Sequence, residues 1–238
     1  LEMVLYGASS IAPAVLSRAM DVFDARFFQF FGMTETSGCT ILLPEHHDPA
    51  GRPDLLASAG VEATGFETRI VGPDDVDLPA GEVGEILCRG PHLMAGYWNR
   101  PDATAEALRN GWMHTGDAGF RTEEGFLFVT DRIKDMIVSG GENVYPREIE
   151  DVFYEHPAVL DAAVIGLPDE RWGERVHAVV VLRPDHTLDA DELTAFVRER
   201  VAGYKAPKTI EFVDTLPRNA TGKVLKTELR ARHTRPAP

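Results

Sequence analysis

Three short segments in the middle of the chain carry side chains that could handle a nucleotide. Asp117 follows Gly116, which needs no Cβ clearance in a turn, so its carboxylate could accept hydrogen bonds from two neighbouring ribose hydroxyls. Arg132 offers a rigid fork of five donors, which suits phosphate or ribose oxygens better than a lysine ammonium does. Gly140 and Gly141 allow positive φ and close approach of a ligand to the backbone. The order and spacing of the three segments are more specific than any one of them.

Each segment also has a purely structural interpretation. We expect Asp117 in a tight turn and the glycine pair in a loop that opens into a helix at Pro146, because proline fits the first helical position. Asp and Gly are common turn residues, so each segment alone would be typical of an ordinary loop. Taken in this order, the segments resemble the adenylate-forming superfamily of acyl-CoA synthetases, nonribosomal adenylation domains and luciferases. The resemblance is closest to the fatty-acyl- and aryl-CoA ligases.

The resemblance extends along almost the whole chain. Residues 6–10 (Tyr-Gly-Ala-Ser-Ser) resemble the adenine-pocket loop of that family, and residues 31–35 (Phe-Gly-Met-Thr-Glu) resemble its Tyr-Gly-x-Thr-Glu signature. Residues 217–223 (Pro-Arg-Asn-Ala-Thr-Gly-Lys) look like the loop that carries the family's adenylation lysine. Phe31 stands where the family usually has tyrosine, so stacking on adenine is retained and the phenol hydroxyl is lost.

The resemblance implies roles for individual residues. The implied catalytic residues are Lys223, Thr34 and Glu35, and Glu35 is also the implied Mg²⁺ ligand. The implied nucleotide-binding residues are Gly7, Ala8, Ser9, Phe31, Gly32, Met33, Thr34, Asp117, Arg132 and Lys223. The implied CoA-binding residues are Gly140, Gly141, Glu142, Trp172 and Tyr204. Lys134 stands where the family has the hinge about which its C-terminal domain swings between two half-reactions.

These roles compete with plainer ones. By composition alone, Lys223 would be a solvated surface residue, whereas its surrounding motif favours contact with negative charge between a carboxylate and an α-phosphate. A Thr-Glu pair alone is typical of a helix N-cap followed by a first-turn acid. Trp172 and Tyr204 could simply cap the core. Residues 46–48 (His-His-Asp) lack a third metal ligand at regular spacing, which favours a loop over a zinc site.

The activity implied by the resemblance is that of an acyl-CoA ligase dependent on ATP and Mg²⁺. A carboxylate and ATP would give acyl-AMP and pyrophosphate, and CoA would then displace AMP. Two alternatives stay open: an adenylation enzyme that loads the phosphopantetheine of a carrier protein, and a fragment that binds AMP or CoA without catalysis. Fatty, aryl and other carboxylic acids are all compatible with these residues.

The composition restricts the partners and the location. Lys plus Arg total 24 against 38 Asp plus Glu, a formal net charge of −14, which argues against nucleic acid or an anionic membrane as the main partner. No apolar run is long enough to span a bilayer, and there is no signal-peptide pattern. Cys39 and Cys88 are too few for a disulfide framework and are typical of reduced core residues in a cytoplasmic protein. The sequence does not indicate an oligomeric state.

The beginning of the chain predicts a larger parent protein. The apolar segment 3–6, close to Leu1, is typical of a buried strand rather than a free terminus. The family has an upstream loop that is rich in Ser, Thr and Gly, ends in lysine and binds the ATP β- and γ-phosphates. That loop has no counterpart in these residues. We therefore expect a C-terminal part that lacks the N-terminal phosphate-loop region and is inactive alone in adenylation.

The predicted fold is α/β followed by α+β. Residues 1–131 are expected to form the C-terminal part of the large AMP-binding domain, with an α/β segment over 1–47 and a β-rich, barrel-like subdomain over 48–131. Residues 132–238 are expected to form a compact α+β lid domain, with the hinge near 131–135. We expect strands at 25–31, 67–71, 83–89, 126–130, 159–165, 176–182 and 210–213, and helices at 14–23, from Pro146, from Asp189 and at 224–232.

Overall fold

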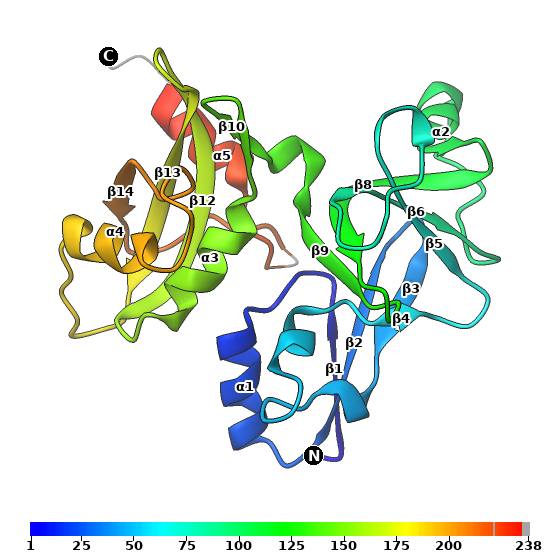
Figure 1. Cartoon of the computed structure of the whole chain (residues 1–238), viewed down its shortest axis with the longest axis horizontal. Coiled ribbons are helices and arrows are strands. Elements are labelled where there is room, and N and C mark those ends of the chain that lie inside the picture. The colour runs from blue at the N-terminus through cyan, green and yellow to red at the C-terminus, as the bar shows by residue number, and fades with distance from the viewer. Residues whose placement is uncertain (221, 235–238) are drawn as a thin grey trace. The chain divides into compact units, whose positions relative to one another are not determined.

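A computed structural model describes residues 1–220 and 222–234 of the chain (Figure 1). The chain divides into two compact units, Leu1–Ile133 and Lys134–Pro238, which we call unit 1 and unit 2. Within the described residues, unit 1 contains two sheets and unit 2 contains one. No helix among those residues is both long and apolar enough to cross a bilayer.

The first sheet of unit 1 has the strand order β1-β2-β3-β4. Its elements are β1 (Met3–Gly7), α1 (Pro13–Val22), β2 (Arg26–Met33), β3 (Ser37–Leu42) and β4 (Val61–Glu62). β1 and β2 run parallel with α1 between them in the chain, while β3 is antiparallel to both of its neighbours. Leu16 of α1 packs with Phe27 and Leu56 in one buried cluster. The α/β character expected of the first residues is therefore confirmed.

The second sheet of unit 1 is antiparallel throughout. Its order is β5-β6-β8-β7, and β9 also pairs with β8. The elements are β5 (Glu67–Val71), β6 (Gly84–Arg89), α2 (Pro101–Ala107), β7 (Leu108–Arg109), β8 (Trp112–Arg121) and β9 (Leu127–Arg132), and short 3-10 helices lie at Pro44–His46, Pro53–Ala57 and Pro73–Asp75. Ile70, Ile86 and Leu127 form part of its buried core. This sheet is the β-rich region that the Gly, Pro and Asp turns predict.

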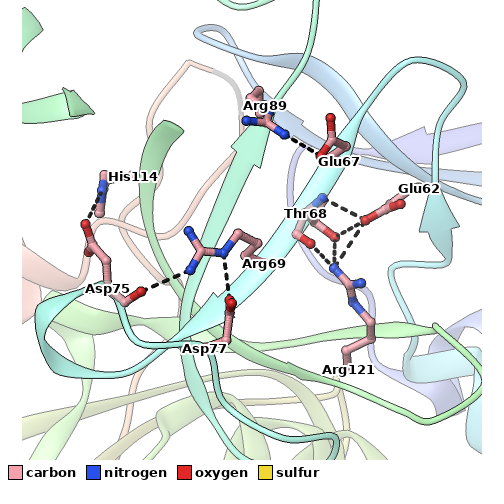
Figure 2. A network of polar contacts seen from close by, with 9 residues as sticks. All are labelled: Glu62, Glu67, Thr68, Arg69, Asp75, Asp77, Arg89, His114 and Arg121. Atoms are coloured by element: carbon pink, nitrogen blue, oxygen red, sulfur yellow. Dashed lines mark hydrogen bonds and ion pairs between the residues drawn. The ribbon is translucent and has the colours of Figure 1, made fainter. Parts of the chain in front are cut away.

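An arginine of β8 links the two sheets of unit 1. Arg121 donates to a carboxylate oxygen of Glu62 at 3.2 Å, and also to the carbonyl and the hydroxyl of Thr68 (Figure 2). Thr68 in turn donates its backbone N–H to the same Glu62 oxygen at 2.7 Å. Because Glu62 belongs to β4 of the first sheet and Thr68 to β5 of the second, the three side chains hold the sheets together.

Unit 2 contains one five-stranded sheet with helices on both of its faces. Its elements are β10 (Ile137–Ser139), β11 (Glu142–Val144), α3 (Pro146–Glu155), β12 (Val159–Asp169), β13 (Gly173–Leu182), α4 (Ala190–Arg198), β14 (Thr209–Phe212) and α5 (Lys226–Thr234). A 3-10 turn at Ile133–Asp135 precedes β10. The order is β11-β10-β13-β12, and β14 pairs with β13 in parallel.

The two faces of this sheet bury different residues. Val164 of β12 packs in a cluster with Ile149 of α3 and Leu193 of α4. Its neighbour Ile165 packs in a second cluster with Leu229 of α5. Because successive side chains of a strand point to opposite faces, α3 and α4 cover one face and α5 covers the other. The α+β character predicted for this part of the chain is confirmed.

Two local predictions are wrong. Asp117 does not lie in a tight turn but inside β8, at a β-bulge where the register with β6 shifts and Gly116 has φ of 69°. The glycine pair does not open into the helix at Pro146 but closes the hairpin between β10 and β11. In both places glycines with positive φ form part of a sheet, as a β-bulge at Gly116 and as a hairpin turn at Gly140 and Gly141. The sequence alone does not distinguish these roles from an ordinary loop.

Candidate functional site

The first group of predicted nucleotide-binding residues lies at the carboxyl end of β1. Gly7 pairs with Phe30 of the parallel strand β2, and a Cβ on Gly7 would lie 2.3 Å from the Phe30 carbonyl oxygen, so only glycine fits. Ala8 then leaves the strand with φ of 64°, and Ser9 follows in a bend. In α/β sheets, ligands bind outside the carboxyl ends of parallel strands. β1 and β2 end at the same edge, which brings residues 7–9 next to the Phe31–Glu35 segment.

That second segment forms the hairpin between β2 and β3. Phe31, Gly32 and Met33 complete β2, and residues 34–36 form the turn. A Cβ on Gly32 would lie 1.7 Å from the Ser37 carbonyl oxygen, so the close approach of the two strands requires glycine. The Thr36 hydroxyl accepts a hydrogen bond from the Met33 backbone N–H at 3.0 Å, which closes the turn. Thr34 and Glu35 therefore sit in a hairpin turn and not at a helix N-terminus.

Glu35 is held by a residue that sequence reasoning did not assign. The Tyr97 hydroxyl donates to Glu35 Oε1 at 2.8 Å, and the Met94 backbone N–H donates to the Glu35 carbonyl oxygen at 2.8 Å. The neighbouring carboxylate raises the pKa of the Tyr97 phenol, so the tyrosine stays a donor. An oriented, partly exposed carboxylate supplies the hard oxygen donors that Mg²⁺ prefers, so this position fits a magnesium ligand.

Asp117 and Arg132 meet across the β8–β9 pair. The two residues are directly opposite in register, and Arg132 Nε lies 3.2 Å from Asp117 Oδ1. Asp117 is 8% exposed, and its backbone N–H donates to the Thr115 hydroxyl, which itself donates to the Ile86 carbonyl at 2.7 Å. The arginine and the bulge thus fix the direction of a mostly buried carboxylate.

In unit 2, the glycine pair closes a two-residue hairpin with positive φ at both positions. Ser139 pairs with Glu142 on either side of Gly140 (φ 63°) and Gly141 (φ 86°), the pattern of a type I′ turn. The Gly140 backbone N–H donates to the Trp172 carbonyl at 2.8 Å, and a Cβ on Gly140 would lie 2.8 Å from the indole ring. The structure therefore brings Gly140 and Trp172 together.

The two aromatic residues predicted near CoA are exposed and lie beside cations. Trp172 is 36% exposed, with the Arg171 guanidinium 4.7 Å and the Lys208 ammonium 5.5 Å from its ring centroid. Tyr204 is 41% exposed, with the Lys205 ammonium 5.8 Å from its ring centroid. An exposed ring can stack on a base, and the Arg171 and Lys208 cations beside Trp172 can neutralise phosphate. The Lys205 ammonium is already paired with both carboxylate oxygens of Glu148 at 2.7 Å, so Tyr204 supplies mainly a stacking surface.

Lys223 is exposed, on a loop between β14 and α5 whose backbone is closed on itself. The Lys223 N–H donates to Asn219 Oδ1 at 2.9 Å, and the Asn219 N–H donates to the Lys223 carbonyl at 2.9 Å. Gly222 has φ of 85° with nothing within 4 Å of its Cβ position. Thr221 of the same motif lies outside the described residues.

A partly exposed polar network that contacts this loop was not identified from the sequence. The Arg218 guanidinium donates to the Gly222 carbonyl and pairs with Asp161 Oδ2 of β12. The Tyr154 hydroxyl of α3 and the Ala162 N–H donate to the other oxygen, Asp161 Oδ1, at 2.7 and 3.0 Å. No motif marks Asp161, because the contact joins residues 57 positions apart.

Lys134 lies in the 3-10 turn at Ile133–Asp135, where the two units meet in the chain. Its neighbour Asp135 is anchored within unit 2, because Arg230 of α5 donates to Asp135 Oδ1 at 2.9 Å. The residue before the turn, Arg132, is anchored within unit 1 through Asp117. The segment between these two anchors is therefore short.

Comparison with known proteins decides the family. The AMP-binding enzyme family matches residues 1–98, and the AMP-binding enzyme C-terminal domain matches residues 148–223. The chain belongs to the AMP-binding enzyme family. The resemblance found in the motifs of the sequence is thus confirmed.

Several AMP-binding enzymes are similar to this chain over nearly all of its length. The fatty acid–[acyl-carrier-protein] ligase ScoC of Streptomyces coeruleorubidus is 45% identical over 233 residues, which are 98% of this chain and 44% of the relative. A feruloyl-CoA synthase of an Amycolatopsis species is 46% identical over 232 residues, 98% of this chain and 46% of the relative. The solved structure of o-succinylbenzoate CoA synthetase (MenE) from Bacillus subtilis, in complex with the acyl-adenylate intermediate OSB-AMP, has a TM-score of 0.86 at 40% identity, covering 97% of this chain and 46% of that chain. This AMP-binding enzyme chain spans about half the length of these relatives.

Proposed function

We propose that this chain carries part of the site of an AMP-forming acid–thiol ligase. In the first half-reaction, a carboxylate oxygen attacks the α-phosphorus of ATP, an acyl–phosphate bond forms and pyrophosphate leaves. In the second, a thiolate attacks the acyl carbon and AMP leaves. The observation that carries the proposal is the identity of 45% and 46% to two ligases that join a carboxylic acid to a thiol, over 98% of the chain.

We assign the nucleotide to the residues at the carboxyl ends of β1 and β2, with Asp117 and Arg132. Gly7, Ala8 and Ser9 would line the adenine on one side, and the Phe31 ring would stack on it. Asp117 would accept hydrogen bonds from the ribose hydroxyls. Its 3.2 Å pair with Arg132 supports this role, because the arginine orients the carboxylate.

We assign the phosphates to the hairpin turn after β2. The Thr34 hydroxyl would donate to an α-phosphate oxygen, with Gly32 and Met33 bringing the backbone close. Glu35 would hold Mg²⁺, which when bound supplies charge neutralisation for the phosphates. The hydrogen bond from Tyr97 supports this role, because it holds Oε1 of Glu35 and thereby orients Oε2, the oxygen that would bind the metal.

In unit 2 we assign one loop to each half-reaction. Lys223 would meet the negative charge that develops between carboxylate and α-phosphate, and its exposed position on a closed loop supports this. Gly140, Gly141 and Glu142 would line the path of the incoming thiol. Exchange of the two loops needs a hinge, and we place it at Lys134, between the anchors at Arg132 and Asp135.

We propose CoA as the thiol. Trp172 and Tyr204, with their neighbouring cations, could bind the phosphate-bearing nucleotide of CoA. The phosphopantetheine of a carrier protein is attached to no such nucleotide. The acyl-carrier-protein ligase among the relatives keeps carrier loading as the second candidate. We further propose that the enzyme is cytoplasmic, which the two free buried thiols Cys39 and Cys88 support.

The test uses a full-length form of the enzyme that carries this chain. We expect ATP–pyrophosphate exchange that requires a fatty or aryl carboxylic acid and Mg²⁺, and thioester formation with free CoA. Trp172→Ala should raise the KM for CoA about tenfold while the exchange stays unchanged. Exchange without added carboxylate would contradict the ligase assignment, and transfer to a carrier protein but not to CoA would favour the second candidate. We expect residues 1–238 alone to show no exchange, because the family's upstream phosphate loop has no counterpart among them.

A further inference from the structure

Three potential metal ligands of unit 2 converge at residues that have no role in the assignments above. His177 lies in β13, Glu211 in β14 and His233 in the last turn of α5. One ligand atom from each lies within 4.8 Å of the other two. β14 pairs with β13 so that His177 is opposite Thr209, and Glu211 is two positions further on and therefore on the same face. The sheet thus presents two ligands toward the third, which comes from a helix.

The geometry of the three atoms is close to that of a metal site. Glu211 Oε2 lies 3.0 Å from His233 Nε2 and 3.8 Å from His177 Nε2, and the two imidazole centroids are 4.5 Å apart. Tetrahedral ligands at about 2.1 Å from Zn²⁺ lie about 3.4 Å from one another. The two distances from Glu211 lie on either side of that value, and the ligand atoms of the two histidines lie within 4.8 Å of each other, so side-chain rotations would complete the arrangement.

The deciding observation is the buried nitrogen of His177. The residue is 5% exposed, and its Nε2 has no hydrogen-bond partner among residues 1–220 and 222–234. Its other nitrogen, Nδ1, lies 2.7 Å from the Thr209 hydroxyl oxygen. If Nδ1–H donates to Thr209, Nε2 presents a lone pair toward Glu211 and His233. This is the pattern of a metal-binding histidine, whose other ring nitrogen is held by an outer partner.

We propose that His177, Glu211 and His233 form a binding site for a divalent transition-metal cation of the Zn²⁺ class, with water completing the coordination. Two imidazoles and one carboxylate suit zinc and its neighbours, whereas Mg²⁺ prefers oxygen ligands alone. The plainer alternative is an ion pair between His233 and Glu211, and it leaves the buried Nε2 of His177 3.8 Å from the carboxylate and without a hydrogen bond among the described residues.

The bound metal would join the end of α5 to two strands of the sheet. α5 directly follows the loop of Lys223, and its first turns are already held by Lys226, 2.8 Å from Glu150, and by Arg230. The site would fix the remaining end, at His233. Its expected role is therefore to restrain the helix that supports the loop.

The experiment titrates the metal-free chain with Zn²⁺ alone, by calorimetry, and then with Co²⁺, by visible absorption. We expect one Zn²⁺ per chain, a rise in the melting temperature of the chain, and Co²⁺ bands typical of tetrahedral coordination. His233→Ala and Glu211→Gln change exposed residues and should fold, and each should weaken Zn²⁺ binding at least about tenfold. Thr209→Val should weaken binding about tenfold through the orientation of His177.

His186→Ala is the matched control, because His186 is exposed and its Nδ1 lies 3.0 Å from the Pro184 carbonyl oxygen, away from the three proposed ligands. This variant should bind Zn²⁺ like the wild type. The proposal is overturned if the wild type does not bind Zn²⁺ with one-to-one stoichiometry. It is equally overturned if His233→Ala and His186→Ala bind the metal with the same affinity, since binding would then belong to scattered surface histidines.

Discussion

The loop that carries Lys223 is connected through Arg218 to side chains outside the 217–223 motif. Asp161 of β12 receives hydrogen bonds from Tyr154 and Ala162 on one oxygen and pairs with Arg218 through the other. Arg218 connects Asp161 to the loop, because its guanidinium also donates to the Gly222 carbonyl. In the proposed ligase these groups would be positioning residues, because they act through Lys223 and not on the substrate.

We predict that Arg218→Ala lowers the adenylation rate by about 10- to 100-fold with little change in the KM for ATP, because it misplaces the lysine without removing it. Asp161→Asn should have a smaller effect in the same direction. The measurement is carboxylate-dependent ATP–pyrophosphate exchange by the full-length form. Arg232→Ala is the control, since Arg232 is exposed and forms an i,i+4 ion pair with Glu228 on the surface of α5. An Arg218 variant that behaves like the Arg232 variant would remove the positioning role.

At the residue scale, the sequence predicts the candidate groups better than their surroundings. The types and order of Asp117 and Arg132 mark them as candidates, and the resemblance of residues 217–223 to a family motif selects Lys223. Tyr97 and Asp161 could not be selected in the same way, because their contacts to Glu35 and Arg218 span 62 and 57 positions. Such contacts exist only after the sheets have formed.

At the scale of elements, two hairpins carry the turns assigned to the phosphates and to the thiol. The β2–β3 hairpin depends on Gly32, where a Cβ would lie 1.7 Å from the Ser37 carbonyl oxygen. We predict that Gly32→Ala lowers the free energy of unfolding of unit 1 by about 3 kcal/mol, because backbone atoms cannot move aside as a flexible side chain can.

Gly38 on the opposite strand provides the matched control. A Cβ there would make only an ordinary contact, 3.5 Å from the Phe30 ring. Gly38→Ala should therefore change the free energy of unfolding by less than about 1 kcal/mol. Chemical denaturation measures both variants by tryptophan fluorescence, in a Trp98→Phe and Trp172→Phe background that leaves Trp112 of unit 1 as the reporter. Equal costs would show that the approach of the two strands is not what requires Gly32.

The β10–β11 hairpin gives a second comparison of adjacent glycines. Gly140 and Gly141 both have positive φ, so alanine should cost about 1 kcal/mol at either position. Only Gly140 also faces the Trp172 ring, at 2.8 Å, so Gly140→Ala should destabilise unit 2 more than Gly141→Ala. In a Trp172→Ala background the difference should disappear. A difference that persists there, measured as melting temperature, would mean that the ring is not its cause.

The elements themselves were largely predictable. The strand at 67–71 is found as β5 with the same bounds, and the helix at Pro146 begins at that residue. The strands expected at 159–165 and 176–182 extend toward each other as the long β12–β13 hairpin. The bulge at Asp117 and the hairpin at the glycine pair were missed, because Gly and Asp have the same local signature in turns, bulges and hairpins.

At the scale of the whole molecule, the chain consists of two compact units joined at residues 133–134. The sequence predicts a hinge near residues 131–135. In the structure, Arg132 contacts Asp117 within unit 1 and Asp135 contacts Arg230 within unit 2. A motion about Lys134 stays a prediction. It is the simplest way for one small domain to present two loops, one for each half-reaction.

The central claim is that this chain carries the lysine of adenylation and, on a separate loop, the glycine hairpin of thiol transfer. Its most direct test measures both half-reactions of Lys223→Ala in the full-length form, with Arg232→Ala as the control. We predict that carboxylate-dependent ATP–pyrophosphate exchange falls by about 100-fold or more, because a charge that stabilises the transition state is lost. Thioester formation from supplied acyl-AMP and CoA should stay within about threefold of wild type, a change of less than 1 kcal/mol. Unchanged exchange, or equal loss of both half-reactions, would contradict the account.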